Sequence, residues 1–367
     1  MADRKAQDRL LALSEAGVSI WLDDLSRQRL DSGTLAHQVE HCHVSGVTTN
    51  PTIFAAAFAD MAAYGAQLAQ LAGQPLDQMI RTLMTTDVKA ACRVLAPVFE
   101  QSGGYDGRVS IEVEPGLAND ASATLAQARL LHDMVDEPNV LVKIPATLNG
   151  LGAIRQTIAA GISVNVTLIF SIKRYQAVLD AYMAGLEDAL AAGLDISSIH
   201  SVASFFVSRV DTEVDQRLTR IGGEAADLMG KAGVANARAA FAEFERITKQ
   251  PRFQALQRAG ANMQRPLWAS TGTKNPACPD TLYVDALIAR PCVNTMPQAT
   301  MDAFADHGSP QVDTITDQID NAWQTLHDLE ADGIDYDEVT ATLEAEGIAK
   351  FTNSWDELVE AVRVAVN

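Results

Sequence analysis

The sequence predicts an α/β fold, a (β/α)8 TIM barrel with extra helices in the connections and at both termini. Short apolar segments rich in β-branched residues recur along the chain, and a longer stretch of helical periodicity follows most of them. Eight such segments are present, which is the number that closes a barrel of parallel strands. The predicted strands are Ser19–Leu25, Gly46–Asn50, Arg108–Glu114, Val140–Ala146, Ser163–Ile169, Ser201–Val207, Pro266–Thr271 and Cys292–Met296.

Helix signals lie between the predicted strands. Pro51 stands where a proline at a first helical position would, and Ser171 precedes a helical pattern that ends at Gly193. Two connections, 51–107 and 211–265, are longer than a barrel needs, and both are rich in alanine with helical periodicity. We expect each connection to hold two or more helices and neither to form a separate domain.

The C-terminal segment, about 312–367, predicts further helices that pack back on the barrel. Two amphipathic patterns lie around Gly333, and the final pattern follows Ser354, which is expected to be its N-cap. We therefore predict that residues 1–367 form a single barrel domain with helical insertions.

Composition and charge limit the classes of partner. The chain has 367 residues, of which 47% are hydrophobic and 20% charged, so it can bury a large core. Its net charge of -19 repels nucleic acid and anionic membranes, and no basic run offsets it. We expect small-molecule partners, with no nucleic acid and no membrane. An anionic substrate would need its own cluster of donors inside a pocket.

Cysteine and histidine positions argue against a disulfide framework and a metal site. The four cysteines lie far apart without a CxxC spacing. His41, Cys42 and His43 are adjacent and cannot chelate one ion together, so we expect neither a metal nor a cofactor. The first residues carry charge and no apolar leader pattern, and no stretch is long enough to span a bilayer. We expect a cytoplasmic protein, either monomer or homodimer.

Polar side chains line one face of four predicted strands. Side chains of a barrel strand alternate between the lumen and the surrounding helices, so polar residues at alternate positions belong to the lumen. Burying them unpaired would cost about 2 to 7 kcal/mol each, so they must pair or serve chemistry. The set comprises Asp23, Ser110, Glu112, Glu114, Lys143, Ser163, Asn165 and Thr167.

Lys143 is the member of this set with the most specific chemistry. Shielding from water favours the free amine of a lysine, which can attack a ketone carbon and form a Schiff base. Asp23 suits the base that removes a substrate hydroxyl proton while a carbon–carbon bond breaks. Glu112 with Thr167 suits a water that shuttles protons as the imine forms and hydrolyses. The alternative interpretation of the set is a structural ion-pair network.

Four motifs around these residues resemble those of transaldolases, over the chain from about Ser19 to Phe304. G-V-T-T-N-P-T resembles the family's A-T-T-N-P signature, and V-S-I-E-V-E resembles its strand with the catalytic glutamate. L-V-K-I-P-A-T resembles the strand with the Schiff-base lysine, and G-I-S-V-N-V-T-L-I-F-S matches G-I-x-x-N-x-T-L-x-F-S. Four motifs in the right order within a βα repeat are a specific signal. The length and the insertions resemble the longer bacterial members.

The resemblance implies a catalytic role for four residues. Lys143 forms the imine, and Asp23 is the acid and base for carbon–carbon cleavage. Glu112 and Thr167 bind the catalytic water. Asp24 replaces the family's usual threonine after the aspartate, and we expect it to point outward.

The resemblance also implies substrate contacts, with the phosphate bound near the ends of the sixth and seventh strands. The later of these sites departs from the family's A-S-F-R-N, because W-A-S-T-G-T-K-N has a lysine and two extra residues. A lysine offers a point charge where an arginine offers a bidentate fork. The implied substrate-binding residues are Thr48, Asn50, Asn165, Ser204, Arg209, Ser270 and Lys274.

The implied reaction is transfer of a dihydroxyacetone unit from a ketose phosphate to an aldose phosphate in the non-oxidative pentose phosphate pathway. A fructose-6-phosphate aldolase-like lyase would use the same residues. Asp23 with Glu112 also suits a glycosidase pair. A metal-dependent aldolase lacks a ligand cluster in the sequence, and an inert sugar-phosphate-binding barrel would tolerate loss of Lys143.

Overall fold

The computed structural model describes residues 2–366, with side chains from residue 8 onward, as a closed barrel of eight parallel strands. Each strand pairs with the next in sequence and β8 pairs with β1, so the predicted (β/α)8 barrel is confirmed. β2 begins and ends earlier than predicted. The strands are β1 (Ser19–Leu22), β2 (Val44–Val47), β3 (Arg108–Glu112), β4 (Val140–Pro145), β5 (Val164–Ile169), β6 (Ser201–Phe206), β7 (Gln264–Ala269) and β8 (Val293–Met296).

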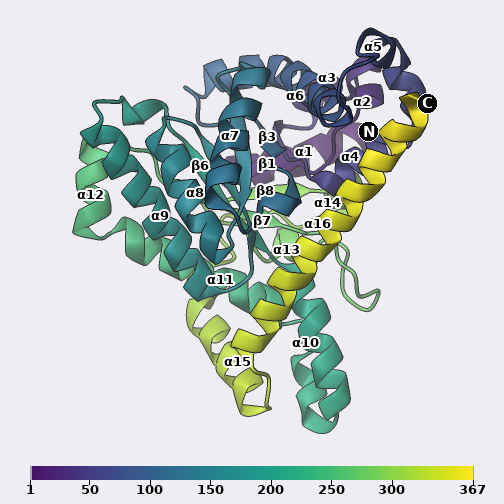
Figure 1. The fold of residues 1–367 in the computed structure, drawn as a ribbon. Helices are drawn as coiled ribbons and strands as arrows, with labels where there is room; N and C mark the ends of the chain where they lie inside the picture. Colours follow the sequence, from purple (N-terminus) through teal and green to yellow (C-terminus); the bar gives the residue numbers. More distant parts are fainter. Residues whose placement is uncertain (1, 367) are drawn as a thin grey trace.

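Helices surround the barrel and fill both long connections (Figure 1). The α-helices are α1 (Ala2–Glu15), α2 (Arg27–Asp31), α3 (Thr34–His41), α4 (Pro51–Phe58), α5 (Gly65–Gln70), α6 (Leu76–Gln101), α7 (Ala121–Val135), α8 (Leu148–Ala159), α9 (Ile172–Ala191), α10 (Ser208–Ile221), α11 (Ala232–Thr248), α12 (Pro251–Arg258), α13 (Leu282–Asp285), α14 (Gln298–His307), α15 (Ile319–Ala331) and α16 (Tyr336–Val366). The 3-10 turns are η1 (Met61–Tyr64), η2 (Pro115–Leu117), η3 (Ile196–Ser198), η4 (Gly223–Leu228) and η5 (Thr316–Gln318).

Local sequence sets the starts of two helices beside the barrel mouth. The Asn50 side chain accepts a hydrogen bond from the Ile53 N–H, and Pro51 occupies the first position of α4. Ser171 caps α9 in the same way by accepting from the Arg174 N–H. Both predicted helix starts are confirmed, and each fixes the path of the chain as it leaves a strand.

An apolar layer fills the lumen between its two mouths. Trp21, Leu141, Leu267 and Val293 are fully buried in one cluster. Gly46 makes room for the indole, because a Cβ at this position would lie 2.4 Å from the Trp21 ring. The layer divides the lumen into an upper part, at the carboxyl ends of the strands, and a lower part at their amino ends.

The C-terminal helix α16 crosses the upper mouth of the barrel and packs on α4, α6 and α10 (Figure 1). The prediction that this segment packs on the barrel is confirmed, but the predicted N-cap at Ser354 is wrong. The helix runs through this position because Phe351, Leu358 and Val362 continue one buried face. The Ser354 hydroxyl instead lies 2.9 Å from the Thr52 hydroxyl on α4.

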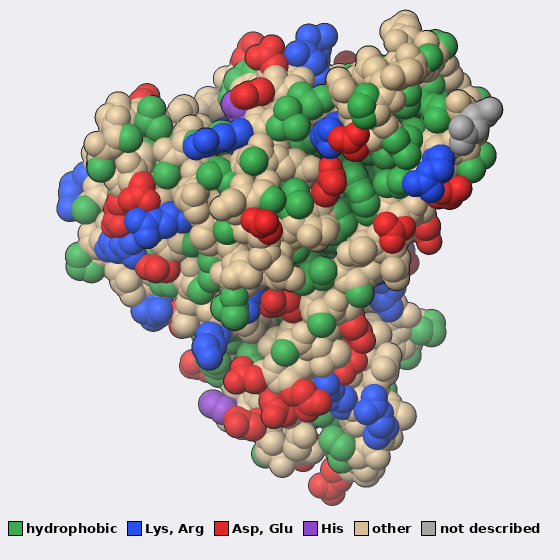
Figure 2. All heavy atoms as spheres, viewed as in Figure 1, with side chains coloured by type: hydrophobic (Ala, Val, Ile, Leu, Met, Phe, Trp, Pro, Cys, Tyr) green, Lys and Arg blue, Asp and Glu red, His purple; other side chains and the backbone are tan. Residues whose placement is uncertain are grey.

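Acidic side chains gather on the lower part of the face in Figure 2, over α15 and the first turns of α16. This surface agrees with the net charge of -19 and gives an anionic ligand no attraction from outside. Within the described residues, no helix is long and apolar enough to cross a membrane. The exposed acidic residues of this region include Asp320, Asp328, Glu330, Asp332, Asp335, Asp337 and Glu338.

Candidate active site

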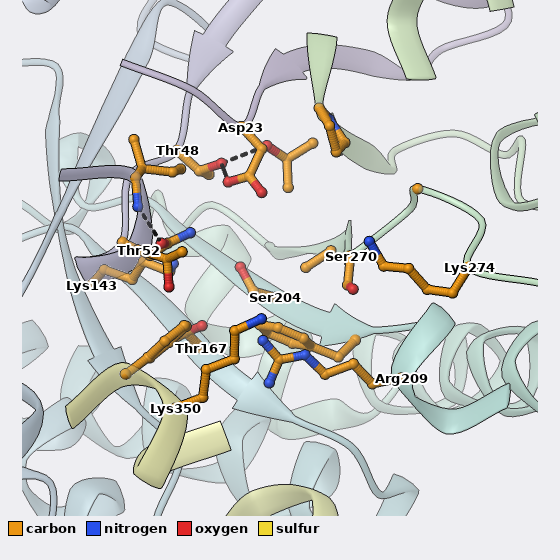
Figure 3. A pocket seen from close by; sticks show the side chains of 18 residues that line it. Asp23, Thr48, Thr52, Lys143, Thr167, Ser204, Arg209, Ser270, Lys274 and Lys350 are labelled. Carbon is orange, nitrogen blue, oxygen red and sulfur yellow. Dashed lines mark hydrogen bonds between the residues drawn. The ribbon is translucent and has the colours of Figure 1, made fainter. Parts of the chain in front are cut away.

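A cavity of about 200 Å³ lies at the carboxyl ends of the strands, beneath α16. Active sites of (β/α)8 barrels occupy this face because the βα loops meet there. Most of the residues predicted from the sequence line this one space (Figure 3). They are Asp23, Thr48, Asn50, Lys143, Thr167, Ser204, Arg209, Ser270 and Lys274.

Lys143 extends from β4 with its amine held between two oxygens. Its Nζ lies 3.0 Å from Glu112 Oε2 and donates a hydrogen bond to the backbone carbonyl of Thr49 at 3.0 Å. Strand register makes this pair, because Glu112 on β3 stands opposite Lys143 on β4. The ring of Phe351 on α16 lies with its centroid 5.8 Å from the amine. Lys143 is only 4% exposed, so its amine is shielded from bulk water.

Asp23 lies at the end of β1 and is oriented by a pair of threonines. Thr48 Oγ1 donates to Asp23 Oδ1 at 2.7 Å and lies 2.6 Å from the Thr295 hydroxyl (Figure 3). Burial raises the pKa of Asp23, and the positive charge of Lys143 opposes that shift. Burial also raises the pKa of the Glu112 carboxyl, and the positive charge of Lys143 again opposes that shift. Two carboxyls that accept protons readily thus flank one amine.

β5 is distorted where it carries Thr167. The pairing with β6 shifts between Val166 and Ile169, and Leu168 has a φ of 58°, in the left-handed region that non-glycine residues rarely adopt. Gly347 of α16 fits closely here, because a Cβ on it would lie 3.0 Å from Leu168 Cδ2. The bulge in β5 and the contact with α16 together fix the position of Thr167 in the wall of the cavity.

The Thr167 hydroxyl is buried and has no hydrogen-bond partner within the part of the chain that the structure describes. A buried hydroxyl left unsatisfied costs about 1–3 kcal/mol, so such a group is normally satisfied by a water or a ligand. This hydroxyl therefore remains available to a substrate or to the water predicted beside Glu112.

Asn165 and Glu112 do not line the open cavity and lie in the layer just beneath it. Asn165 Nδ2 donates to Ser110 Oγ at 2.9 Å, and its Oδ1 accepts from Ser204 Oγ at 2.7 Å. These bonds tie β3, β5 and β6 together. Asn165 therefore orients Ser204, which itself lines the cavity, and direct contact of Asn165 with substrate stays a prediction.

Three cations converge at the other side of the cavity. Arg209 of α10, Lys274 of the loop after β7 and Lys350 of α16 all line it (Figure 3). Arg209 lies over two rings, 5.1 Å from the Phe206 centroid and 5.9 Å from that of Phe351. None of the three forms an ion pair with a carboxylate within 4.0 Å among residues 8–366. This is the donor cluster that an anionic substrate requires.

The electrostatics of these cations reflect their closeness. Burial lowers the pKa of Lys350, and the charges of Arg209 and Lys274 lower it further. Burial also lowers the pKa of Arg209. Cations held this close repel one another, and a bound phosphate would relieve the repulsion.

Ser270 completes this side of the cavity. It has a φ of 57°, and its hydroxyl lies 2.8 Å from that of Ser208 at the start of α10. A non-glycine residue in this region is held there by its surroundings, and such strain concentrates at functional sites. The conformation keeps the Ser270 side chain at the cavity wall.

Several residues of the cavity were not predicted from the sequence. Lys350 and Phe351 come from α16, far along the chain, and only the docking of that helix brings them to the barrel mouth. Thr295 on β8 follows the alternation that marks the lumen face and could have been found from it. The Thr49 contact to Lys143 uses a backbone carbonyl, which no side-chain pattern reveals.

Two expectations about acidic residues have different outcomes. Glu114 was expected on the lumen face, but β3 ends at Glu112, and the Glu114 carboxylate instead accepts from Gln127 on α7 and Arg81 on α6. The alternation fails there because the strand has ended. Asp24 pairs with Arg29 and does not line the cavity, as expected for a residue that points away from it.

The adjacent histidines take different conformations. His41 is the last residue of α3, and His43 lies outside that helix with a φ of 57°. Among the residues that the structure describes, no group of three or more His, Cys, Asp or Glu side chains is placed to hold a metal ion.

The sequence profile of the family described as Transaldolase/Fructose-6-phosphate aldolase matches residues 20–362, which includes every residue of this cavity. The chain belongs to this family. It is 55% identical to the protein named Transaldolase 1 from Streptomyces avermitilis, over 98% of this chain and 96% of that protein. It is 56% identical to Transaldolase from Acidothermus cellulolyticus, over 97% of this chain and 96% of the relative. It is also 55% identical to Transaldolase from Mycobacterium ulcerans, over 100% of this chain and 99% of that relative.

Proposed function

We propose that this chain is a transaldolase. It moves a dihydroxyacetone unit from sedoheptulose 7-phosphate or fructose 6-phosphate to glyceraldehyde 3-phosphate or erythrose 4-phosphate, through a Schiff base on Lys143. The observation that carries the proposal is the shielded Lys143 amine, flanked by Glu112 and Asp23, in a cavity whose other side is cationic. The names of the relatives and the match to the family support it. A role in the non-oxidative pentose phosphate pathway and a cytoplasmic location belong to the same proposal.

Substrate binding begins at the cationic side. Arg209, Lys274 and Lys350 hold the phosphate, and Ser270 adds a hydroxyl beside them. The ketose chain then extends across the cavity toward Lys143. Binding the two ends of the substrate at once orients its carbonyl for attack, which replaces a bimolecular encounter by an intramolecular one.

Imine formation requires Lys143 to lose a proton and then attack the ketone carbon. Glu112, whose pKa is raised by burial, takes that proton across the 3.0 Å contact. The resulting carbinolamine loses its hydroxyl as water, and a water between Glu112 and Thr167 delivers the proton that this step needs. The product is a protonated Schiff base, whose positive charge withdraws electrons from the neighbouring carbon.

Carbon–carbon cleavage uses Asp23 as the base. It removes the proton of the substrate's C4 hydroxyl, the C3–C4 bond breaks, and its electron pair enters the iminium to give an enamine on Lys143. The aldose phosphate leaves. An acceptor aldehyde then reacts with the enamine, Asp23 returns its proton to the new hydroxyl, and water hydrolyses the imine.

Borohydride trapping tests this mechanism. We expect incubation with fructose 6-phosphate and then borohydride to leave a dihydroxyacetone adduct on the peptide that contains Lys143, as read by mass spectrometry. An exposed lysine, Lys231, serves as the control and should remain unmodified. An unmodified Lys143 peptide would sink the Schiff-base mechanism and would favour an inert sugar-phosphate-binding barrel.

Two further measurements separate the alternatives. A fructose-6-phosphate aldolase-like lyase would release free dihydroxyacetone without an acceptor, whereas the transaldolase should release it far more slowly than it transfers it. A metal-dependent aldolase would lose activity in EDTA and regain it with a divalent ion. We expect EDTA to leave the transfer rate unchanged.

A further inference from the structure

A second cavity, of about 430 Å³, lies at the lower mouth of the barrel, at the amino ends of the strands. The apolar layer around Trp21 separates it from the candidate active site. Arg108 of β3, Arg265 of β7 and Arg290 of the loop before β8 line it, and the described lining residues include no Asp or Glu. Three arginines around one cavity are unusual in a chain with a net charge of -19, and they indicate a ligand with negative charge.

Arg108 is buried in the wall of this cavity, and one nitrogen of its guanidinium has no partner among the described residues. It is 2% exposed, its Nε donates to the Gly104 carbonyl at 2.7 Å, and its guanidinium lies 5.2 Å from the Phe99 ring centroid. Its Nη1 is buried and has no hydrogen-bond partner in the described part of the chain. Buried charged donors are normally saturated, so this atom is free to bind a ligand oxygen.

Arg265 is fixed by its neighbours. It is 4% exposed, and its guanidinium lies 4.0 Å from the centroid of the Tyr105 ring. Its two terminal nitrogens donate to Asp106 Oδ1 at 3.1 and 3.2 Å, while Ser19 donates to the other oxygen of that carboxylate. Asp106 thus balances one of the three positive charges and leaves the cavity cationic.

His200 also lines this cavity, and the neighbouring arginines affect its pKa. Its pKa is lowered to about 3, first by burial and then by the charges of Arg108 and Arg265. Its Nε2 lies 3.3 Å from the Asn262 amide, which also lines the cavity. The ring is therefore neutral at physiological pH and adds a polar group without adding charge.

We infer that the lower mouth is a second anion site, which binds a phosphate group independently of the catalytic cavity. Arginine forks match the oxygens of a phosphate, and the cavity has more room than a phosphate alone requires. The phosphate can come from inorganic phosphate or from a phosphorylated metabolite, and the chemistry of recognition is the same for both. No step of the proposed reaction reaches this mouth.

Isothermal titration with inorganic phosphate tests the inference once the upper cations are removed. In the triple variant Arg209→Gln, Lys274→Gln, Lys350→Gln, we expect one phosphate to bind per chain. Adding Arg290→Gln, at an exposed position, should weaken that binding about fivefold. The matched control Arg129→Gln, an exposed arginine on α7 with the same change of charge, should not alter it.

A conservative variant and a second ligand sharpen the test. Arg265→Lys keeps the charge but loses the fork, and we expect binding to weaken about tenfold. With Lys143→Met added to the triple variant, so that no Schiff base can form, fructose 6-phosphate binding more tightly than inorganic phosphate would identify a metabolite as the source of the phosphate, and equal or weaker binding would identify phosphate itself. Absence of phosphate binding to the triple variant, or binding that neither Arg290→Gln nor Arg265→Lys weakens, would overturn the inference.

Discussion

The two mouths of the lumen contain buried charge of different kinds. The upper mouth holds an amine between carboxyls that have raised pKa values, Lys143 with Asp23 and Glu112. The lower mouth is lined by arginines, and Arg265 is tied to a carboxylate. Carboxyl and amine groups can give up and accept protons during a reaction, whereas guanidinium groups hold a fixed charge and serve in binding. The two cavities therefore differ in the type of charge that they bury, and this difference is the reason why we propose a reaction at the upper mouth and binding alone at the lower mouth.

Among substitutions in the two mouths, Lys143→Met should have the largest effect. Removing the nucleophile of an enzyme that works through a covalent intermediate lowers kcat by about 10⁴-fold or more. We expect transfer between fructose 6-phosphate and erythrose 4-phosphate to fall by at least this factor in a coupled assay, with the near-UV circular dichroism spectrum unchanged. Lys231→Met is the control and should keep full activity. An inactive variant that is also unfolded would make Lys143 structural.

Asp23→Asn should separate the two chemical stages of the upper mouth. The amide cannot take the hydroxyl proton, so kcat should fall about 10²- to 10⁴-fold. In the proposed mechanism, imine formation uses Glu112 and Thr167 and not Asp23, so borohydride should still trap the substrate on Lys143. The two measurements are steady-state kinetics and peptide mass spectrometry. Loss of the adduct together with activity would show that Asp23 acts before cleavage.

Gly46→Ala should disturb the layer that keeps the two mouths apart. The new Cβ would lie 2.4 Å from the Trp21 ring, so the indole or β2 must shift. Overpacking of this kind costs about 1–3 kcal/mol of the free energy of unfolding, measured by urea denaturation. Gly65→Ala on α5 is the control, because nothing lies within 4 Å of its Cβ, and it should be neutral or slightly stabilising. Equal stability of the two variants would contradict the tight packing of the layer.

Lys350→Gln should have the smallest effect and tests the contribution of α16 to phosphate binding. Loss of one partly exposed cation should raise KM for fructose 6-phosphate about fivefold and leave kcat nearly unchanged. KM for an acceptor without a phosphate, such as glyceraldehyde, should not change. A similar rise in KM for both substrates would show that Lys350 acts through the fold of α16 rather than through the phosphate.

Much of the barrel was predictable because its signals are local. Strand segments repeat with helical segments between them, and caps such as Asn50 and Ser171 mark where helices begin. The predictions failed where a boundary depends on a distant neighbour. α16 continues through Ser354 because Phe351, Leu358 and Val362 form one buried face against distant parts of the chain. Glu114 lies beyond the end of β3, where Gln127 and Arg81 bind its carboxylate.

The candidate site divides in the same way. Asp23, Lys143 and Thr167 were identified from strand alternation and motifs, and the structure brings them to one cavity. Lys350 and Phe351 were not identified, because a lysine beside an aromatic residue on an amphipathic helix looks like any solvated helix face. They line the cavity only because α16 docks over it.

The sequence by itself determined the barrel and the lumen side chains of its strands, because side-chain alternation along a strand is a local property of the backbone. Only the tertiary structure decided which side chains surround the two cavities at the ends of the lumen. Docking of α16 over the upper mouth shields Lys143 and adds a third cation, and the Trp21 layer isolates Arg108 and Arg265 below. Contacts between residues distant in sequence set these features, and no pattern within one segment encodes them.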